Sequence, residues 1–289
     1  MAEYPDTYGW DTVFAISIDK VNLALAQKPP SATFSATAPT TNGTASLNWS
    51  LTKWEVTDTP GGADIKISMR FGPLSQLTLT AGGVDTNYDI ALSGYLCTVT
   101  FEAWFPPSSG NLIPQTGRNQ PWAFVEIAVP DPSLFEVKVT LQTLLSAWFA
   151  TPAAAALFEQ EFLEIDMSAD VGADELPWLI PKQLGYAGGL MADGVTKAIG
   201  ILAMTLPGKQ PSAADLRLSP YAIPANADAG FVISRQLAMT NMFLPAIAGA
   251  FSTDGKGDVG NFDLDSQTWQ LTNKASLAFK HELSGKDQD

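Results

Sequence analysis

The chain has very few of the residues that carry most enzyme chemistry. Its 289 residues include one histidine, His281, and one cysteine, Cys97. A Ser-His-Asp triad is improbable with a lone histidine near the C-terminal end. A zinc site of the Cys/His type needs three or four such ligands, so that site is excluded. A disulfide within one chain is excluded as well. We therefore expect a protein that is not an enzyme, with no catalytic residue, no metal site and no cofactor.

Basic residues are also scarce. The chain has 16 Lys and Arg against 30 Asp and Glu, a net charge of −14. Binding to a phosphate backbone requires clustered cations, and here the basic residues are scattered singly. No polybasic segment is present for anionic lipid headgroups either. The composition predicts no nucleic-acid partner.

Long apolar runs are missing too. The longest nearly uncharged one, residues 144–158, is interrupted by Pro152. It is shorter than the ~20 residues that a membrane-spanning helix needs. The N-terminal residues do not show a basic stretch followed by an apolar one, so no signal peptide is visible. We expect a soluble protein without a transmembrane segment.

Alternating apolar and polar residues predict a chain rich in β-strands. The alternation is clear over residues 65–71 and 47–51, and its phase shift predicts a bulge near 52–53. A second phase flip at Gly94 predicts a bend in a long strand. Residues 135–141 also alternate, and we expect a strand there.

Helical spacing follows a short apolar run near the N-terminus. Residues 13–16 predict a strand, and Ile18, Val21 and Leu25 then fall on one face of a helix that ends before Pro29. Ser17 is placed to cap this helix. Another helix is expected over residues 151–165.

The pattern Phe-x-Ile-Ser occurs twice. Residues 231–234 repeat the spacing of residues 14–17, and helical spacing follows both copies. Ser234 is thus predicted to cap a helix as Ser17 does. The repeat indicates one full β-rich unit and the beginning of a second.

Two motifs near the C-terminus have structural explanations. Residues 255–260 match G-x-G-x-x-G, but strand-like alternation follows them instead of a helix, so a hairpin loop is favoured over a dinucleotide site. Oxygen-bearing side chains gather between residues 254 and 265 without the spacing of a calcium loop. We expect no metal at this cluster, whose members are Asp254, Asp258, Asn261, Asp263 and Asp265.

Three segments, in order along the chain, resemble one family. They are Tyr8–Leu25, Trp178–Met204 and Phe231–Pro245. They are similar to the P-47 and OrfX proteins, bacterial accessory proteins encoded beside botulinum neurotoxins and related to insecticidal proteins. The family is placed in the TULIP, or tubular lipid-binding, superfamily. The resemblance implies a curved antiparallel sheet around a long helix, often in two units, and binding of lipids or other apolar molecules beside toxin-complex proteins. It also implies a bacterial cytoplasmic or released protein.

These observations lead to one expectation for the fold and two for the function. We expect an α+β fold: a strongly curved antiparallel sheet wrapped around long amphipathic helices. A TULIP-like unit over 1–225 is followed by a partial second unit over 226–289. The favoured function is binding of a lipid or apolar ligand as a toxin-cluster accessory or insecticidal component. The alternative is a protein–protein scaffold module whose tube is filled by its own side chains. The expected ligand contacts lie on the first helix and on a facing strand: Ile18, Val21, Leu25, Phe135, Val137 and Val139.

Overall fold

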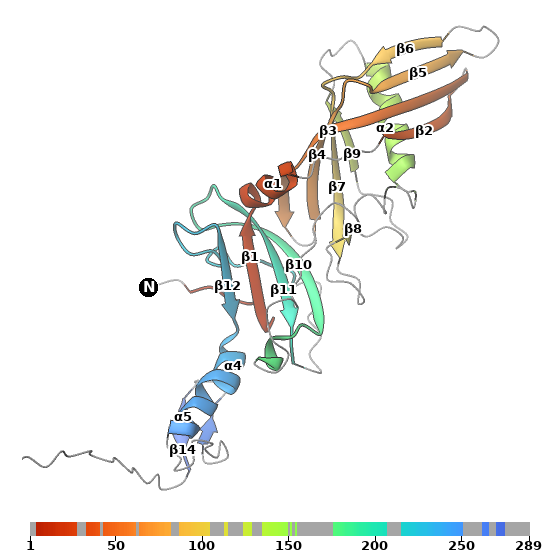
Figure 1. Cartoon of the computed structure of the whole chain (residues 1–289). Helices are drawn as coiled ribbons and strands as arrows, with labels where there is room; N and C mark the ends of the chain where they lie inside the picture. The colour runs from red at the N-terminus through yellow and green to blue at the C-terminus, as the bar shows by residue number, and fades with distance from the viewer. Residues whose placement is uncertain are drawn as a thin grey trace, which may run out of the picture. The chain divides into compact units, whose positions relative to one another are not determined.

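The chain divides into two compact units, residues 1–232 and 233–289 (Figure 1). The computed structural model describes residues 4–27, 33–40, 43–61, 64–81, 87–104, 113–114, 124–128, 135–149, 151, 154, 176–206, 215–250, 262–265 and 270–274. The boundary between the units falls seven residues after the sequence-predicted one at 225/226. Each unit is described separately below.

A four-stranded antiparallel sheet is built from segments far apart in the sequence. Its order is β10-β11-β1-β12, with bounds Gln183–Leu190, Lys197–Met204, Thr12–Ser17 and Ala229–Ile233. The amide of Ser17 donates to the carbonyl of Asp228 (2.9 Å), so the end of β1 meets the start of β12. The strand predicted at 13–16 is confirmed.

A larger antiparallel sheet occupies the rest of the first unit. Its strands follow the order β6-β5-β3-β4-β7-β8, with β2 added on β3 and β9 on β7. The bounds are β2 Thr33–Thr40, β3 Gly43–Gly61, β4 Asp64–Phe71, β5 Gln76–Ala81, β6 Asn87–Ala91, β7 Leu96–Trp104, β8 Ile113–Pro114 and β9 Phe124–Ala128.

The long strand β3 organises this sheet. Its first half pairs with β5 and its second half with β4. The register shifts between Leu51 and Lys53, which confirms the predicted bulge. At Gly94 the strand is interrupted rather than bent: β6 and β7 are separated by residues 92–95, and Gly94 has φ +83°. The amide of Gly94 donates to the carbonyl of Phe71 at 3.2 Å. The break between β6 and β7 therefore lies next to the break between β4 and β5.

The first helix, α1 (Ile18–Gln27), forms as predicted. The hydroxyl of Ser17 accepts the amide of Lys20 at 3.4 Å, which confirms the cap. The apolar stripe of the helix packs on β3.

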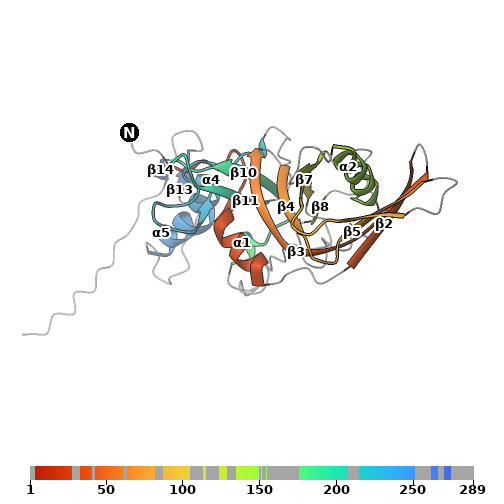
Figure 2. The same cartoon turned by 90° about the horizontal axis from the view of Figure 1, so that it is seen from above.

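The segment 135–149 corrects a prediction. It is a 15-residue helix, α2 (Phe135–Phe149), and not a strand. Its buried residues recur at helical spacing: Val137, Leu141, Leu144, Leu145, Trp148 and Phe149. A separation of four residues satisfies both a period of two and a period of 3.6, so positions 137 and 141 fit either pattern. Helix α2 contacts β2 and β9 (Figure 1), and Figure 2 shows it on one side of the strands that include β2 and β5.

The second unit begins with a continuous helical segment. It consists of α4 (Arg235–Ala238), the π-helical turn η4 (Met239–Phe243) and α5 (Leu244–Ala250). The hydroxyl of Ser234 accepts the amide of Leu237 at 3.2 Å, so the second predicted cap is confirmed. A short hairpin of β13 (Phe262–Leu264) and β14 (Leu271–Asn273) follows.

The helix expected over 151–165 lies almost entirely outside the described residues. Thr151 and Ala154 are described, and the hydroxyl of Thr151 accepts the amide of Ala154 at 3.4 Å. A short 3-10 turn, η2 (Pro177–Leu179), precedes β10.

The first unit has two hydrophobic clusters. The larger one joins the inner face of the eight-stranded sheet, α1, α2 and one face of β11. The smaller one covers the other face of β1 and β11, where Trp10 and Leu218 pack. Mostly antiparallel α+β architecture is thus confirmed. The long amphipathic helices are not: α1 has 10 residues and α2 has 15.

Candidate functional site

The first half of the predicted ligand surface is sealed in the core. Ile18, Val21 and Leu25 are all buried on α1 and belong to the larger cluster. They lie against β3, which contributes Trp54 and Val56 to the same cluster. The stripe was predicted correctly, and its surroundings are protein side chains.

The second half does not form one surface. Because α2 is a helix, Val137 points to the core and is 7% exposed, whereas Phe135 and Val139 are 67% and 44% exposed. Val137 therefore joins the α1 residues in the larger cluster, while the other two lie on the outer side of α2. Four of the six predicted contacts thus belong to one buried cluster, three from α1 and one from α2, while Phe135 and Val139 are exposed.

Aromatic rings occupy the space between α2 and the sheet. Trp49 on β3 lies at the centre of this group and is completely buried. Its ring centroid is 4.9 Å from that of Trp148, 5.2 Å from Phe34, 5.5 Å from Phe71 and 6.3 Å from Phe149. Among the described residues, none accepts the indole N–H of Trp49. Ring packing of this kind is favourable, and these rings pack closely between α2 and the sheet.

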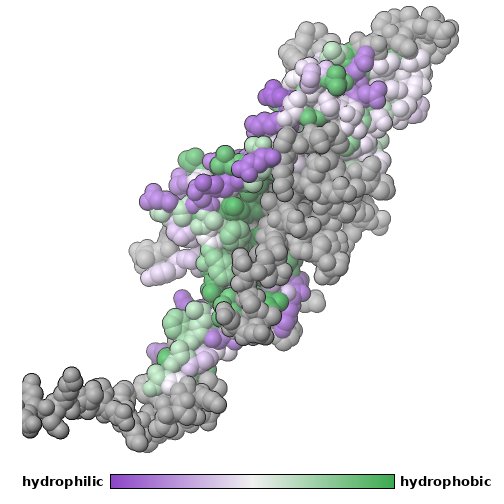
Figure 3. Space-filling view, viewed as in Figure 1, coloured by the Kyte–Doolittle hydropathy of each residue, from purple (hydrophilic) through white to green (hydrophobic). Residues whose placement is uncertain are grey.

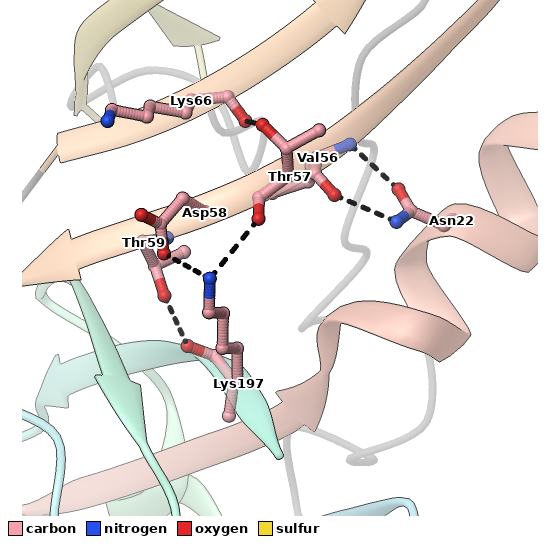
Figure 4. Close-up of polar contacts among 8 residues, drawn as sticks. Asn22, Val56, Thr57, Asp58, Thr59, Lys66 and Lys197 are labelled. Carbon is pink, nitrogen blue, oxygen red and sulfur yellow. Dashed lines mark hydrogen bonds and ion pairs between the residues drawn. The ribbon is translucent and has the colours of Figure 1, made fainter. Parts of the chain in front are cut away.

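One polar side chain lies beside the buried stripe of α1. The amide group of Asn22 donates to the carbonyl of Val56 and accepts its N–H, both at 2.8 Å (Figure 4). Asn22 thus replaces a neighbouring strand for one residue of β3 and satisfies both backbone groups of the buried Val56. The sequence signal for this contact was an asparagine beside an apolar helical stripe. The signal does not identify the partner, which is 34 residues away.

The two sheets are joined next to this contact. Lys197 on β11 forms a 2.7 Å ion pair with Asp58 on β3, and the hydroxyl of Thr59 donates to the carbonyl of Ala198 at 3.4 Å (Figure 4). The hydrogen bond from Lys197 holds the pKa of Asp58 below its usual value, against a smaller opposing effect of burial. A Cβ atom at Gly188 on β10 would collide with Thr59, so glycine permits this close approach.

A buried carboxylate secures the start of β1. Asp11 is 1% exposed, and its Oδ2 accepts the amides of Thr205 and Leu206, each at 2.8 Å. These bonds join residues that are 194 and 195 positions apart in the sequence. All the donors are backbone or hydroxyl groups of the chain itself, so the arrangement is structural.

The described residues offer little reactive chemistry. Cys97 is buried, and burial raises the pKa of its thiol, which keeps it in the unreactive thiol form. Within the described part of the chain, no group of three or more His, Cys, Asp or Glu could hold a metal ion. Asp254, Asp258 and Asn261 lie outside that part, while Asp263 pairs with Lys274 at 2.6 Å. The same described residues include no helix long and apolar enough to cross a membrane.

Comparison with known proteins identifies the family of the chain. A family model described as OrfX-like, Protein OrfX2/OrfX3/P47, matches residues 7–281. Protein OrfX3 of Clostridium botulinum (strain Kyoto / Type A2) is 24% identical over 297 residues, which cover 91% of this chain and 58% of that protein.

Two solved structures share the fold. P47 from Clostridium botulinum A2 matches with a TM-score of 0.62 and 18% identity over 91% of this chain and 59% of that one. P47 of Clostridium botulinum E1 matches with a TM-score of 0.63 and 17% identity over 93% and 63%. The chain therefore spans about three-fifths of the length of these relatives. Because the family model matches nearly the whole sequence, this protein belongs to the OrfX-like family of OrfX2, OrfX3 and P47 proteins.

Proposed function

We propose that the protein is a non-enzymatic accessory of a toxin gene cluster that contacts protein partners through its outer surface. The observation that carries this proposal is the buried ring group around Trp49, which occupies the interior between α2 and the sheet. The family relationship to toxin-cluster proteins supports the setting. An insecticidal role belongs to the same proposal and rests on the resemblance alone.

A filled interior argues for a scaffold because opening it is costly. Each large apolar side chain stabilises the fold by roughly 1.5–3 kcal/mol when buried. A ligand inserted between α1 and β3 would have to displace several such side chains, including Val21 and Leu25. Asn22 and the Asp58–Lys197 pair further tie α1 and β11 to β3.

Binding of an apolar ligand is the second candidate, and one observation favours it. The indole N–H of Trp49 is buried without an acceptor among the described residues, and a buried donor normally has one. An ester carbonyl of a lipid would satisfy it. In this alternative the ligand contacts would be Ile18, Val21, Leu25 and Val137, which share the same cluster as Trp49.

Native mass spectrometry of the purified protein separates the two candidates. A filled interior predicts the mass of the chain alone. Stoichiometric lipid released on denaturation would contradict the scaffold proposal. Trp49→Phe then tests the anchor: loss of lipid from this variant, but not from Trp148→Phe in the same ring group, would establish the second candidate.

Cross-linking tests the partner directly. The protein should be co-expressed with the other products of its gene cluster and treated with a lysine-reactive reagent. We expect cross-links from lysines on the outer surface, such as Lys20 and Lys53, whose side chains are 44% and 55% exposed. A protein that elutes alone after co-expression, with no cross-links to any cluster product, would contradict the proposal.

A further inference from the structure

One edge of the eight-stranded sheet, formed by β2, has no neighbouring strand on its outer side among the described residues. Among the described strands, β2 pairs with β3 alone. The amide of Ser50 donates to Ser75 (3.0 Å) and its carbonyl accepts from Gly72 (2.8 Å), so this residue of β3 faces the β5 side. Alternate residues of a strand point their N–H and C=O in opposite directions. Trp49 and Leu47 therefore face β2.

The same alternation determines which residues of β2 face outward. Trp49 and Leu47 are in register with Phe34 and Ala36, which point their backbone groups to β3. The intervening residues Thr33, Ser35 and Thr37 thus direct N–H and C=O away from the sheet. Their side chains are exposed, and Ser and Thr have the intermediate hydropathy that Figure 3 colours pale.

Between Thr33 and Thr37 this edge carries no charge and no proline, and no described strand covers it. Natural edge strands carry charges, bulges or covering groups that prevent association with another strand. Further along, β3 follows this rule, because Asn22 covers the backbone groups of Val56. By contrast, residues 29–52 contain no charged side chain, although the whole chain carries −14.

The absence of charge favours one particular partner, a second copy of the chain. In a two-fold interface each residue near the axis meets its own copy, so any charge there would face a like charge. A partner of different sequence would impose no such requirement. We propose that β2 pairs antiparallel with β2 of a second copy, centred on Ser35.

This register satisfies the backbone geometry. Ser35 then faces Ser35 of the second copy, and Thr33 faces Thr37 in both directions. All three belong to the outward-facing set, so about six inter-strand hydrogen bonds would form, two for each pair. Pro39, which lacks an N–H, lies beyond the paired residues. Because the interface is small, the dimer is weak and depends on concentration.

Analytical ultracentrifugation of the full chain up to about 0.5 mM tests the pairing. We expect wild type to dimerise and Ser35→Lys and Ser35→Glu each to dimerise at least tenfold more weakly. An equimolar mixture of these two variants should recover dimers, because their opposite charges meet at the axis. Asn48→Lys is the matched control: it places a lysine on the same sheet face, on β3 beside Ser35, and should dimerise like wild type.

Several results would overturn the proposal. These are a monomeric wild type at every concentration, unchanged dimerisation of Ser35→Lys, or a mixture that recovers no dimer although both single variants lost it. Circular dichroism must show that each variant is folded.

Ser35→Pro provides a second test, because it removes an outward N–H without adding charge. Its loss of dimer should not be reversed by salt. Salt should partly restore Ser35→Lys. Because the partner here is the chain itself, these results are independent of cross-links to other cluster products.

Discussion

The side chain of Asn22 hydrogen-bonds the backbone of β3 as a neighbouring strand would. Its amide group satisfies both the N–H and the C=O of Val56, which is 1% exposed. Asn22→Ala leaves both groups buried without a partner, so we expect a loss of about 2 kcal/mol or more in the free energy of unfolding. Urea denaturation followed by tryptophan fluorescence measures it. Leu23→Ala, at a 59% exposed position on the same helix, should change stability by less than about 0.5 kcal/mol.

Asp58 should make the stability depend on pH in a defined direction. Its pKa in the folded protein is lowered below the ordinary 3.8, mainly by the hydrogen bond from Lys197. The pair therefore stabilises the fold above that ordinary pKa, and the contribution disappears as pH falls through the lower folded-state pKa. Since the side chains of Lys197 and Asp58 are 40% and 33% exposed, we expect at most about 1 kcal/mol.

The comparison of wild type with Asp58→Asn isolates this contribution from the other carboxylates. The difference in unfolding free energy should be present at pH 7 and should shrink as the pH falls below 3.8. A difference that grows as the pH falls would contradict the assigned sign.

At the scale of elements, two serines initiate helices in different units. The hydroxyls of Ser17 and Ser234 accept amides at 3.4 and 3.2 Å. Each Ser→Ala change should cost about 0.5–2 kcal/mol. Hydrogen exchange read by mass spectrometry should show faster exchange in 18–27 for Ser17→Ala and in 235–250 for Ser234→Ala. Unchanged exchange in both helices would mean that the caps do not stabilise them.

The helical structure of α2 predicts that the same Val→Ala substitution lowers stability at one position and leaves it nearly unchanged at another. Val137 is 7% exposed and Val139 is 44% exposed. Val137→Ala should cost about 1.5–3 kcal/mol through lost burial and a cavity. Val139→Ala should be nearly neutral, because alanine is the better helix former. If urea denaturation showed equal losses of unfolding free energy for both variants, the two valines would be equally buried, as on one face of a strand, and the helix would be contradicted.

At the scale of the whole molecule, excess negative charge limits contact with membranes. With 30 acidic and 16 basic residues, repulsion from anionic lipid should cancel the attraction of scattered cations at neutral pH. We predict that vesicle binding in flotation assays varies little between 50 and 500 mM salt. It should strengthen between pH 7.4 and 4.5, as carboxylates with pKa values near 4 begin to lose charge. Strong binding at neutral pH that vanishes in high salt would reveal a basic patch formed by the fold.

The sequence alone determined the features that depend on neighbouring residues. The alternation at 65–71, the bulge before Lys53 and the caps at Ser17 and Ser234 all follow from local backbone geometry. The family also followed from sequence, because its characteristic segments are local. The domain boundary near residue 225 and the ligand role of the α1 stripe are still predictions.

Only the tertiary structure decided how these segments combine. At 135–141 a four-residue separation suits both a strand and a helix, and packing against the sheet selected the helix. That choice separated Phe135 and Val139 from the interior. The Asn22–Val56 contact and the rings around Trp49 join residues 34 and about 100 positions apart, and no local pattern specifies such pairs. Whether an apolar stripe forms sealed core or an open binding surface depends on what folds against it, and here Trp148 and Phe149 fold against the sheet.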